Sequence, residues 1–421
     1  MLLSRLNNPI RRKELLMKNM IILYKQSKDK NFFTVLVIFA SLIILSGVFA
    51  TATEATCPPN PLLDPGPSVT IGTVAELVNA VQQANASGNL TIFLKDGTYT
   101  LSNMLWISGN NITFRSLSGN RDAVILRGQG MDGPVTHIFN VAGKYFTAAD
   151  LTIGWVQNHA IQIHGESNAS FPLIHNVHFV DTNEQMLKVS YTAGNPASSD
   201  SGVVEGCLFE YSAGVGPQYY IGGVDVNQGS NWIVRNNLFR GIRSPDSTLA
   251  EHAIHFWSES SNTLVEKNVI VNCDRGIGFG LGDRGHVGGI IRNNMVSTTE
   301  DVGIGLENSS DTMVYNNTVF TPNYMNSIEY RFARTRGGAI LNNLTNAAIT
   351  SRDGGSATVQ KNVTNAQAAW FVNPTLGNLH LASALPTVVD QGQTLTDVME
   401  DIDCEARPQG RAYDIGADER R

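Results

Sequence analysis

The sequence predicts an all-β protein, a right-handed parallel β-helix (solenoid) with an N-terminal capping helix and an irregular C-terminal cap. Three observations predict this fold. A five-residue strand pattern recurs seven times between residues 160 and 331, and an asparagine-containing phrase recurs every 19 to 31 residues between 176 and 362. The composition is rich in glycine and only 16% charged, which is typical of turn-rich β proteins. Repeats of this length indicate a solenoid in which each repeat forms one coil.

The N-terminal region, residues 1–52, has the composition of a secretory signal peptide with a long basic leader. An apolar run from Asn31 to Ala50 follows a lysine- and arginine-rich stretch and precedes small polar residues. The alternative is a single N-terminal membrane anchor. We expect a secreted, periplasmic or cell-surface protein that has no membrane contact after signal cleavage.

The charge of the remaining chain argues against nucleic acid as a partner. Residues 1–50 hold eight of the 30 Lys/Arg and two of the 37 Asp/Glu residues, so the rest of the chain has 13 more acidic than basic residues. Nucleic-acid-binding proteins need a basic surface. An acidic polymer remains a candidate partner only if a locally basic groove exists.

The four cysteines are too few and too scattered to predict a disulfide framework or a CxxC metal site. Cys57 and Cys404 lie near the two ends of the predicted fold. Cys207 and Cys273 lie within the repeats, where we expect small buried thiols.

The segment before the repeats is expected to contain a linker and a capping helix. Residues 53–70 are proline-rich and predict an extended linker. From Thr73 to Ala86 the apolar spacing is helical, and Thr73 with Glu76 forms a capping-box sequence. This helix would cover the first coil. Alternating strands follow at 90–101 and 111–117.

The β-helix is expected over residues 71–365, and its seven strand copies predict two columns of outward side chains. In every copy the second and fourth residues are apolar, so the third and fifth point outward. The first column is Gln162, Lys188, Asp225, His255, Gly278, Gly305 and Glu329. The second column is His164, Ser190, Asn227, Trp257, Gly280, Glu307 and Arg331. Longer loops before the opening strand, at 210–222 and 241–252, and after it, at 191–202 and 281–288, are expected to wall this face.

The asparagine phrase predicts tight corners between successive strands. The positions that we align are Asn176, Gly206, Asn237, Asn268, Asn294, Asn317, Asn343 and Asn362. Asparagine tolerates the left-handed bend of such a corner, and stacked amides would bond along the solenoid axis. We expect a structural role for these residues.

Residues 366–421 lose the repeat and are expected to form the C-terminal cap that a solenoid needs. The tail also carries a cluster of carboxylates, which is the alternative prediction of a calcium site. Its members are Asp401, Asp403, Asp414, Asp418 and Glu419.

The helix TVAELVNAVQQA, the strand IFLKDGTYTL, the repeated G-I-x-apolar and N-N phrases and the DID…RP…DIGADE tail together resemble the pectate-lyase-like superfamily of right-handed parallel β-helices. The resemblance covers nearly everything after residue 70. It implies a saccharide groove along the opening strand of each coil, where the two columns lie. It does not distinguish lyases, hydrolases, epimerases and non-catalytic members, because their family-specific motifs are absent from the sequence.

The ladder Lys188–Asp225–His255 is the expected catalytic group. These residues occupy consecutive coils ~4.8 Å apart. Uronate β-elimination needs a base, a cation opposite the carboxylate and a proton donor for the leaving oxygen. Lys188 or His255 is the expected base, with Asp225 orienting it or holding a calcium ion. The alternative is a Lys188–Asp225 ion pair that only balances charge and raises the pKa of the lysine.

The expected substrate-binding residues are His164, Asn227, Trp257, Glu307, Glu329 and Arg331. A tryptophan face beside amides suits a sugar ring. Glu307 and Glu329 are diagonal neighbours ~8 Å apart, a separation compatible with an inverting hydrolase. An internal salt bridge with Arg331 is the competing explanation.

Two further groups are expected to have no direct chemistry. The glycines at 276, 278, 280 and 282 fall on strand positions and predict a flat floor that a ligand or loop approaches closely. The histidines outside the columns lack metal spacing and are expected at the surface or in turns: His175, His178 and His252.

Together these patterns predict a monomeric, secreted β-helix protein that cleaves an acidic, uronate-containing polysaccharide by β-elimination. The alternatives are a glycoside hydrolase or epimerase on the same fold, or a non-catalytic carbohydrate-binding protein.

Overall fold

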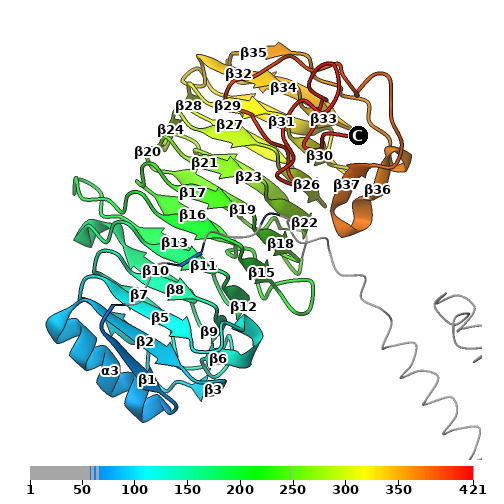
Figure 1. The fold of residues 1–421 in the computed structure, drawn as a ribbon. Coiled ribbons are helices and arrows are strands. Elements are labelled where there is room, and N and C mark those ends of the chain that lie inside the picture. Colours follow the sequence, from blue (N-terminus) through cyan, green and yellow to red (C-terminus); the bar gives the residue numbers. More distant parts are fainter. Residues whose placement is uncertain (1–56, 58–60, 63–65, 247, 421) are drawn as a thin grey trace, which may run out of the picture. The chain divides into compact units, whose positions relative to one another are not determined.

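The computed structural model describes residues 57, 61–62, 66–246 and 248–420, so the predicted signal peptide and most of the predicted linker lie outside the described residues. The described chain winds into three long parallel sheets around one continuous apolar core (Figure 1). The predicted right-handed parallel β-helix is confirmed. In the part that the structure describes, no helix combines the length and apolarity needed to cross a membrane.

The ten-stranded sheet that carries both predicted columns is called the column sheet. Its strands are β4 (Leu105–Ile107), β7 (Phe139–Val141), β10 (Ile161–His164), β13 (Leu187–Ser190), β16 (Val224–Asn227), β19 (His252–Trp257), β23 (Arg275–Phe279), β27 (Ile304–Glu307), β31 (Asn326–Arg331) and β34 (Ala348–Arg352). The seven predicted copies occupy β10 to β31, and three strands that the pattern did not include extend the sheet.

The other two long sheets complete each coil. The twelve-stranded sheet contains β1 (Ser68–Ile71), β2 (Leu90–Leu94), β5 (Ile112–Ser116), β8 (Thr147–Ala149), β11 (Leu173–His175), β14 (Val203–Glu205), β17 (Ile233–Arg235), β21 (Leu264–Glu266), β25 (Ile290–Arg292), β29 (Met313–Tyr315), β32 (Gly338–Leu341) and β35 (Ala357–Gln360). The third sheet contains β3 (Gly97–Thr100), β6 (Val124–Arg127), β9 (Thr152–Val156), β12 (His178–Thr182), β15 (Leu208–Glu210), β18 (Leu238–Arg240), β22 (Val269–Cys273), β26 (Met295–Thr298), β30 (Thr318–Phe320) and β33 (Leu344–Thr345).

Smaller elements connect or close the coils. They are the three-stranded sheet β20 (Ser260–Ser261), β24 (His286–Val287) and β28 (Ser309–Ser310), the antiparallel pair β36 (Phe371–Asn373) and β37 (Asn378–Leu381), and the short 3-10 helices η1 (Arg121–Ala123), η2 (Gly165–Ser167), η3 (Ala368–Trp370) and η4 (Pro374–Leu376).

The helix α3 (Val74–Ser87) packs on the first coil as predicted. The Thr73 Oγ1 accepts a hydrogen bond from the Glu76 N–H (3.2 Å), and the Glu76 carboxylate accepts one from the Thr73 N–H (3.1 Å). This reciprocal pair is the predicted capping box. The buried face of α3 belongs to the same core as β2 and β4. The strand β1 begins at Ser68, inside the segment predicted as linker.

At the corner between the twelve-stranded sheet and the third sheet, two adjacent residues of each coil have separate roles, whereas we had expected one residue to have both. The first has a left-handed backbone: Asn176, Gly206, Asn236, Lys267, Asn293, Asn316, Asn342 and Lys361. The second forms the buried amide ladder: Asn237, Asn268, Asn294, Asn317, Asn343 and Asn362. Our alignment mixed the two positions by placing Asn176 and Gly206 with the ladder. The hydrogen-bonded ladder itself is confirmed.

Two other repeated contacts stabilise the coils. In the core, the rings of Phe179, Phe209 and Phe239 stack with centroids 4.4 and 4.5 Å apart. Each fully buried ring contributes roughly 1.5–3 kcal/mol relative to exposure. Below the asparagine ladder, the buried thiol of Cys207 takes the corresponding place and accepts a hydrogen bond from the Val177 N–H. The predicted buried thiols, Cys207 and Cys273, are confirmed.

The remaining two cysteines form a single disulfide, whereas the sequence analysis excluded only a disulfide framework. Cys57 and Cys404 are bonded although 347 residues separate them in the chain. Their spacing gave no signal of this bond because a solenoid folds distant segments against one flank, so sequence separation says nothing about their distance in space. The bond fixes the predicted linker to the C-terminal cap.

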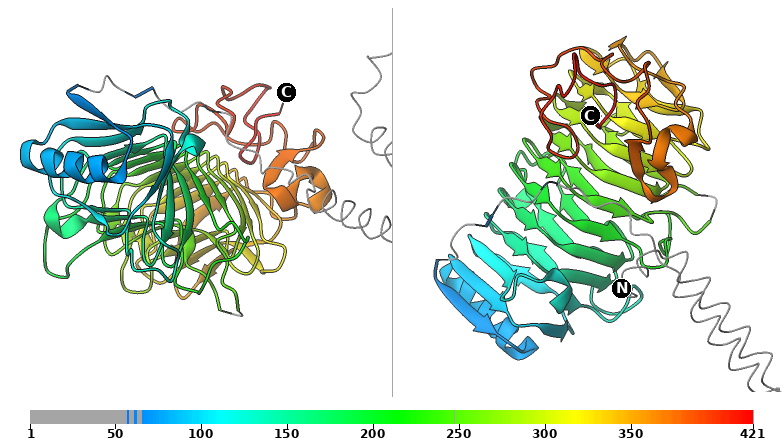
Figure 2. Two further views of the ribbon diagram at one scale, coloured as in Figure 1. Left: turned by 90° about the horizontal axis from the view of Figure 1, so that it is seen from below. Right: turned by 45° about the vertical axis from the view of Figure 1, so that its right-hand side comes forward.

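The C-terminal segment packs along the flank of the solenoid rather than only over its last coil (Figure 2). Phe371 and Ile415 join a cluster with Val271 and Met295 of the third sheet. The tail carboxylates serve the cap internally. Asp401 accepts hydrogen bonds from backbone N–H groups of the tail, as does Asp414. The buried Arg407 donates to Glu419 (2.8 Å).

Candidate functional site

The two columns cross the column sheet in the predicted register. In the first column the β-partners follow the order Gln162, Lys188, Asp225, His255, Gly278, Gly305 and Glu329. In the second column His164 faces Ser190, Asn227 faces Trp257 and Glu307 faces Arg331. Trp106 and Asn140 extend the first column at one end and Thr350 at the other. Their strands lie outside the seven copies, so the pattern did not find them.

The predicted catalytic ladder forms one hydrogen-bonded cluster. The Lys188 ammonium lies 3.1 Å from Asp225 Oδ1. The same oxygen accepts hydrogen bonds from Trp257 Nε1 (2.8 Å) and Asn227 Nδ2 (3.4 Å). The His255 ring stacks on Trp257, with centroids 5.0 Å apart. Strand alternation therefore brings together the residues that the sequence analysis singled out.

The ladder is buried, which changes what it can do chemically. Asp225 and His255 are 2% and 1% exposed. Burial opposes the charged form of Lys188, but Asp225 outweighs burial and the pKa of Lys188 is raised. Burial likewise opposes the charged form of Asp225, but the Lys188 ammonium and the hydrogen bond from Trp257 outweigh burial, so the pKa of Asp225 is lowered. The alternative prediction, a Lys188–Asp225 ion pair that raises the pKa of the lysine, is therefore the one that fits, and Lys188 keeps its proton. The Asp225 oxygen with three donors is poorly placed to accept calcium.

Loops on either side of the column sheet cover the ladder and form a roof over it. The Arg284 guanidinium lies 3.8 Å from the centroid of the Trp257 ring. Tyr220, from the loop before β16, lies 5.9 Å from the Lys188 ammonium. Trp257 is therefore covered by a cation on the face that we expected to contact a sugar ring.

An open pocket of about 620 Å³ lies beside this roof, over the part of the column sheet nearer the C-terminus. Gly280, Gly282 and Gly305 line it. A Cβ on Gly280 would lie 1.8 Å from the Glu307 carbonyl oxygen, so a side chain is excluded there. Gly278 instead receives the ring of His252, which would lie 2.8 Å from a Cβ at that position. The glycines allow close approach, as predicted. Gly280 and Gly282, however, lie after β23 with positive φ angles and not on strand positions, so that part of the prediction was wrong.

The two glutamates of the hydrolase alternative both lie in this pocket and are both ion-paired. Arg331 Nη1 lies 2.9 Å from Glu307 Oε1, and Arg352 Nη1 lies 2.7 Å from Glu329 Oε2. The competing explanation, an internal salt bridge with Arg331, is present. A hydrolase needs one of its two carboxyls to deliver a proton, and arginine partners favour the ionised form.

Two further arginines and a tyrosine line the pocket. Arg275 pairs with Asp301 (3.1 Å). Arg284 has no carboxylate partner among the residues that the structure describes. The Tyr324 hydroxyl donates to Glu329 (2.8 Å), and burial together with this carboxylate raises the pKa of Tyr324 to about 12. The pocket therefore contains one guanidinium without an acidic partner and one hydroxyl that retains its proton.

His164 lies away from this pocket on β10, four strands from β23 in the column sheet. Its Nδ1 contacts Glu166 (2.7 Å), and its ring lies 5.3 Å from that of the exposed Trp106. The structure does not bring His164 together with Glu307, Glu329 and Arg331.

The expectation for the other histidines was wrong. His175 lies in β11 against Glu205 (3.0 Å), and His178 lies in β12 against Glu210 (2.8 Å). His252 opens β19, is buried, and has its ring centroid 4.7 Å from that of His255. Sequence reasoning excluded it because it considered only spacing among these three histidines. The segment Glu251–His255, with two histidines three residues apart after a glutamate, was the signal that it missed.

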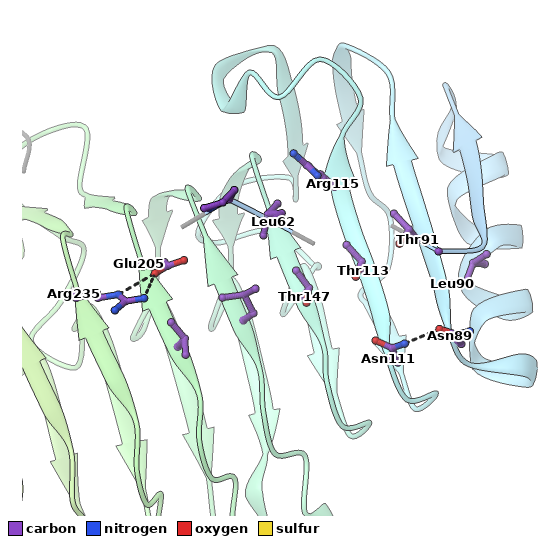
Figure 3. Close-up of a pocket in the computed structure, with 14 residues that line it drawn as sticks. Leu62, Asn89, Leu90, Thr91, Asn111, Thr113, Arg115, Thr147, Glu205 and Arg235 are labelled. Carbon is purple, nitrogen blue, oxygen red and sulfur yellow. Dashed lines mark hydrogen bonds and ion pairs between the residues drawn. The ribbon is translucent and has the colours of Figure 1, made fainter. Parts of the chain in front are cut away.

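A second pocket of about 480 Å³ lies on the twelve-stranded sheet (Figure 3). Thr91, Thr113 and Thr147 form a row across β2, β5 and β8. The charged residues at its edge are already paired, with Arg235 Nη2 2.7 Å from Glu205. This pocket offers little chemistry beyond hydroxyls, so the pocket of the column sheet is the better functional candidate.

Comparisons with known proteins agree on the fold. Residues 216–363 match the family model described as "Periplasmic copper-binding protein (NosD)". Among curated protein sequences none matches the chain. The crystal structure of pectate lyase Pel9A has a TM-score of 0.56 at 14% identity, covering 81% of this chain and 90% of that one.

Two further solved structures are more distant. An alginate lyase from Paenibacillus sp. str. FPU-7 has a TM-score of 0.42 at 15% identity, covering 70% of this chain and 99% of that one. The A-module of the Azotobacter vinelandii mannuronan C-5 epimerase AlgE6 has a TM-score of 0.38 at 10% identity, covering 69% and 94%. At 14% identity the similarity to Pel9A concerns the fold alone, a parallel β-helix.

Proposed function

We propose that this protein binds an acidic polysaccharide along the column sheet and cleaves it by β-elimination at the pocket beside Arg284. The observation that carries the proposal is this pocket, whose lining includes four arginines, one of them without a carboxylate partner in the described chain. Its volume lies in the range of small-ligand sites. Four carboxylates line the same pocket, so in this proposal Arg284 itself, and not a net positive surface, binds the anionic group of the polymer.

The proposed chemistry assigns roles to three groups. The Glu307 carboxylate, which lines the pocket in its ion pair with Arg331, accepts the proton next to the uronate carboxylate. The Arg284 guanidinium faces the uronate carboxylate and stabilises the negative charge that develops as this proton leaves. The Tyr324 hydroxyl, with a pKa of about 12, keeps its proton at neutral pH. In this proposal it exchanges its hydrogen bond to Glu329 for the leaving oxygen and protonates that oxygen, and solvent then returns the proton from Glu307 to Tyr324. β-elimination is preferred over hydrolysis because Glu307 and Glu329 are both engaged by arginines.

In this proposal the predicted catalytic ladder does not contact the substrate but positions Arg284. Arg284 lies on the Trp257 ring, and the Trp257 indole N–H donates to Asp225, which is paired with Lys188. The ladder therefore positions the guanidinium through Trp257. The His255 ring stacks on the Trp257 ring and helps to hold it in place.

Two observations support an extracytoplasmic setting for this function. The Cys57–Cys404 disulfide is of the kind that forms in oxidising compartments. The matching family model carries the description periplasmic, and the fold neighbour Pel9A is a pectate lyase. Secretion and an acidic polysaccharide substrate are therefore parts of the proposal.

Saccharide binding without cleavage is the second candidate, because Lys188, Asp225 and His255 are buried. The test is incubation with a panel of polyuronates, pectate and alginate among them, while the ultraviolet absorbance of unsaturated products and the release of reducing ends are followed. Both signals together support the lyase. Binding with neither signal supports the second candidate, and reducing ends without the absorbance support hydrolysis.

A matched pair of variants tests the role of Arg284. Arg284→Ala removes a charge-assisted contact worth about 1.5–3 kcal/mol, so binding should weaken about 10- to 150-fold. Arg411→Ala removes the same charge from an exposed position in the cap and should change nothing. Equal behaviour of the two variants would exclude the pocket as the anion site.

A further inference from the structure

The segment Glu251–His252–His255 brings three ligand-type side chains together at the edge of the pocket. One ligand atom from each lies within 4.8 Å of the other two. Glu251 precedes β19, His252 is its first residue, and His255 lies three residues further along the same strand. Atoms bound to one metal at 2.0–2.2 Å lie within about 4.4 Å of each other, so small side-chain rotations suffice to close the site.

These side chains also have polar atoms that the protein does not satisfy. Glu251 Oε2, His252 Nδ1 and His255 Nδ1 are buried and have no hydrogen-bond partner among the described residues. Buried polar atoms are almost always paired, and each unpaired one costs about 1–3 kcal/mol. Three such atoms in one cluster indicate a common ligand.

The second nitrogen of His255 has the surroundings of a metal-binding histidine. Its Nε2 lies 3.3 Å from the carbonyl oxygen of Gly280. Donation to that carbonyl fixes the proton on Nε2 and leaves the Nδ1 lone pair free, as second-shell carbonyls do for metal-bound imidazoles.

The local charge favours a cation. Lys188 is neutralised by Asp225, and the Arg275 guanidinium by Asp301 at 3.1 Å. Glu251 Oε2 forms only a long ion pair with Arg275 Nη1, at 3.9 Å, which is beyond hydrogen-bond distance. Because Asp301 shares this guanidinium at a shorter distance, the negative charge of Glu251 is incompletely neutralised.

We propose that Glu251, His252 and His255 bind a divalent first-row transition metal of the zinc class. Two imidazoles and one carboxylate suit such an ion, whereas calcium takes oxygen ligands. This site is distinct from the Asp225 calcium site of the sequence analysis. It does not depend on the proposed lyase activity, because it rests on protein atoms alone.

The glycine at 278 is part of this site. The His252 ring lies flat against it, 2.8 Å from where a Cβ would be. A side chain there would move the ring without removing a ligand. Gly278→Ala is therefore a second way to perturb the site.

The test is equilibrium dialysis of the mature chain against Zn²⁺ in the absence of saccharide, followed by elemental analysis. We expect about one zinc per chain, and at least a 10-fold weaker affinity in His252→Asn, Glu251→Gln and Gly278→Ala. Co²⁺ provides a second readout, because its visible absorption bands report nitrogen coordination and should diminish in the same variants. Circular dichroism checks that each variant is folded.

Two matched controls locate the ion. His286→Asn removes a buried histidine outside the cluster, and His380→Asn removes the histidine of the cap cluster formed with Asp403 and Asp418. Both should bind zinc as the parent protein does. The proposal is overturned if the parent retains no zinc, if His252→Asn and Glu251→Gln bind normally, or if His380→Asn abolishes binding.

Discussion

Replacing one rung of the buried amide ladder should destabilise the whole solenoid. Asn294 is fully buried. Its Oδ1 accepts hydrogen bonds from the N–H and the Nδ2 of Asn268, both at 3.0 Å. Its Nδ2 donates to Asn317 Oδ1 (2.9 Å) and to the Val265 carbonyl oxygen (3.0 Å). The substitution Asn294→Ala removes these four hydrogen bonds and a fifth, from Nδ2 to the Arg292 carbonyl oxygen (3.0 Å).

The magnitude follows from the groups left behind. Two buried donors on Asn268 lose their acceptor, and each orphaned donor costs about 1–3 kcal/mol, so the expected loss is about 2–6 kcal/mol. Asn294→Asp keeps the acceptor but places an oxygen against the Val265 carbonyl. It should therefore destabilise at least as much as alanine.

The measurement is the free energy of unfolding from urea denaturation, followed by circular dichroism. Asn103→Ala, at an exposed position, is the matched control. If Asn294→Ala shifts the midpoint no further than Asn103→Ala, the amide ladder does not hold the coils together and the reasoning is refuted.

Three further predictions concern stability. Burial lowers the pKa of His286 to about 3, so near pH 6.5 the unfolded chain binds a proton at this residue that the folded chain does not bind. The free energy of unfolding should therefore fall by about 2 kcal/mol more between pH 6.5 and 4.5 in the parent than in His286→Gln. Urea denaturation at a series of pH values measures this, and parallel pH profiles of the two proteins would contradict it. Reduction of the Cys57–Cys404 disulfide should lower the free energy of unfolding by about 2–5 kcal/mol, measured as a lower melting temperature. A double Cys→Ala variant should show the same lower melting temperature without reductant. A further effect of reductant on that variant would contradict the assignment. Arg407→Met should cost about 3–5 kcal/mol by leaving Glu419 buried without its partner, and adding Glu419→Leu should restore much of it in a double-mutant cycle.

The repeating part of the fold could be predicted because each coil repeats the same local physics. The apolar alternation in AIQIH or GVDVN determines which residues are buried, so the β-partners from Gln162 to Glu329 followed directly. The capping box of Thr73 and Glu76 is likewise a local signal.

Contacts between different loops could not be predicted in the same way. That Arg284 covers Trp257 depends on the path of the loop after β23, which no periodicity encodes. The same applies to His252, whose burial depends on the missing side chain of Gly278 in the next coil. The candidate site is therefore the pocket beside the ladder and not the predicted ladder itself, because the loops cover the ladder.

The disulfide between Cys57 and Cys404 also determines how the molecule would bear tension. Cys404 belongs to a cap anchored halfway along the solenoid, where Lys267 contacts Glu400 (2.7 Å). A pull applied at Cys57 is therefore transmitted through the covalent bond to the middle coils. The first coils, which contact only their neighbours, would be bypassed instead of being peeled away one at a time. Stretching a single molecule should show this as a high-force event that disappears in reductant.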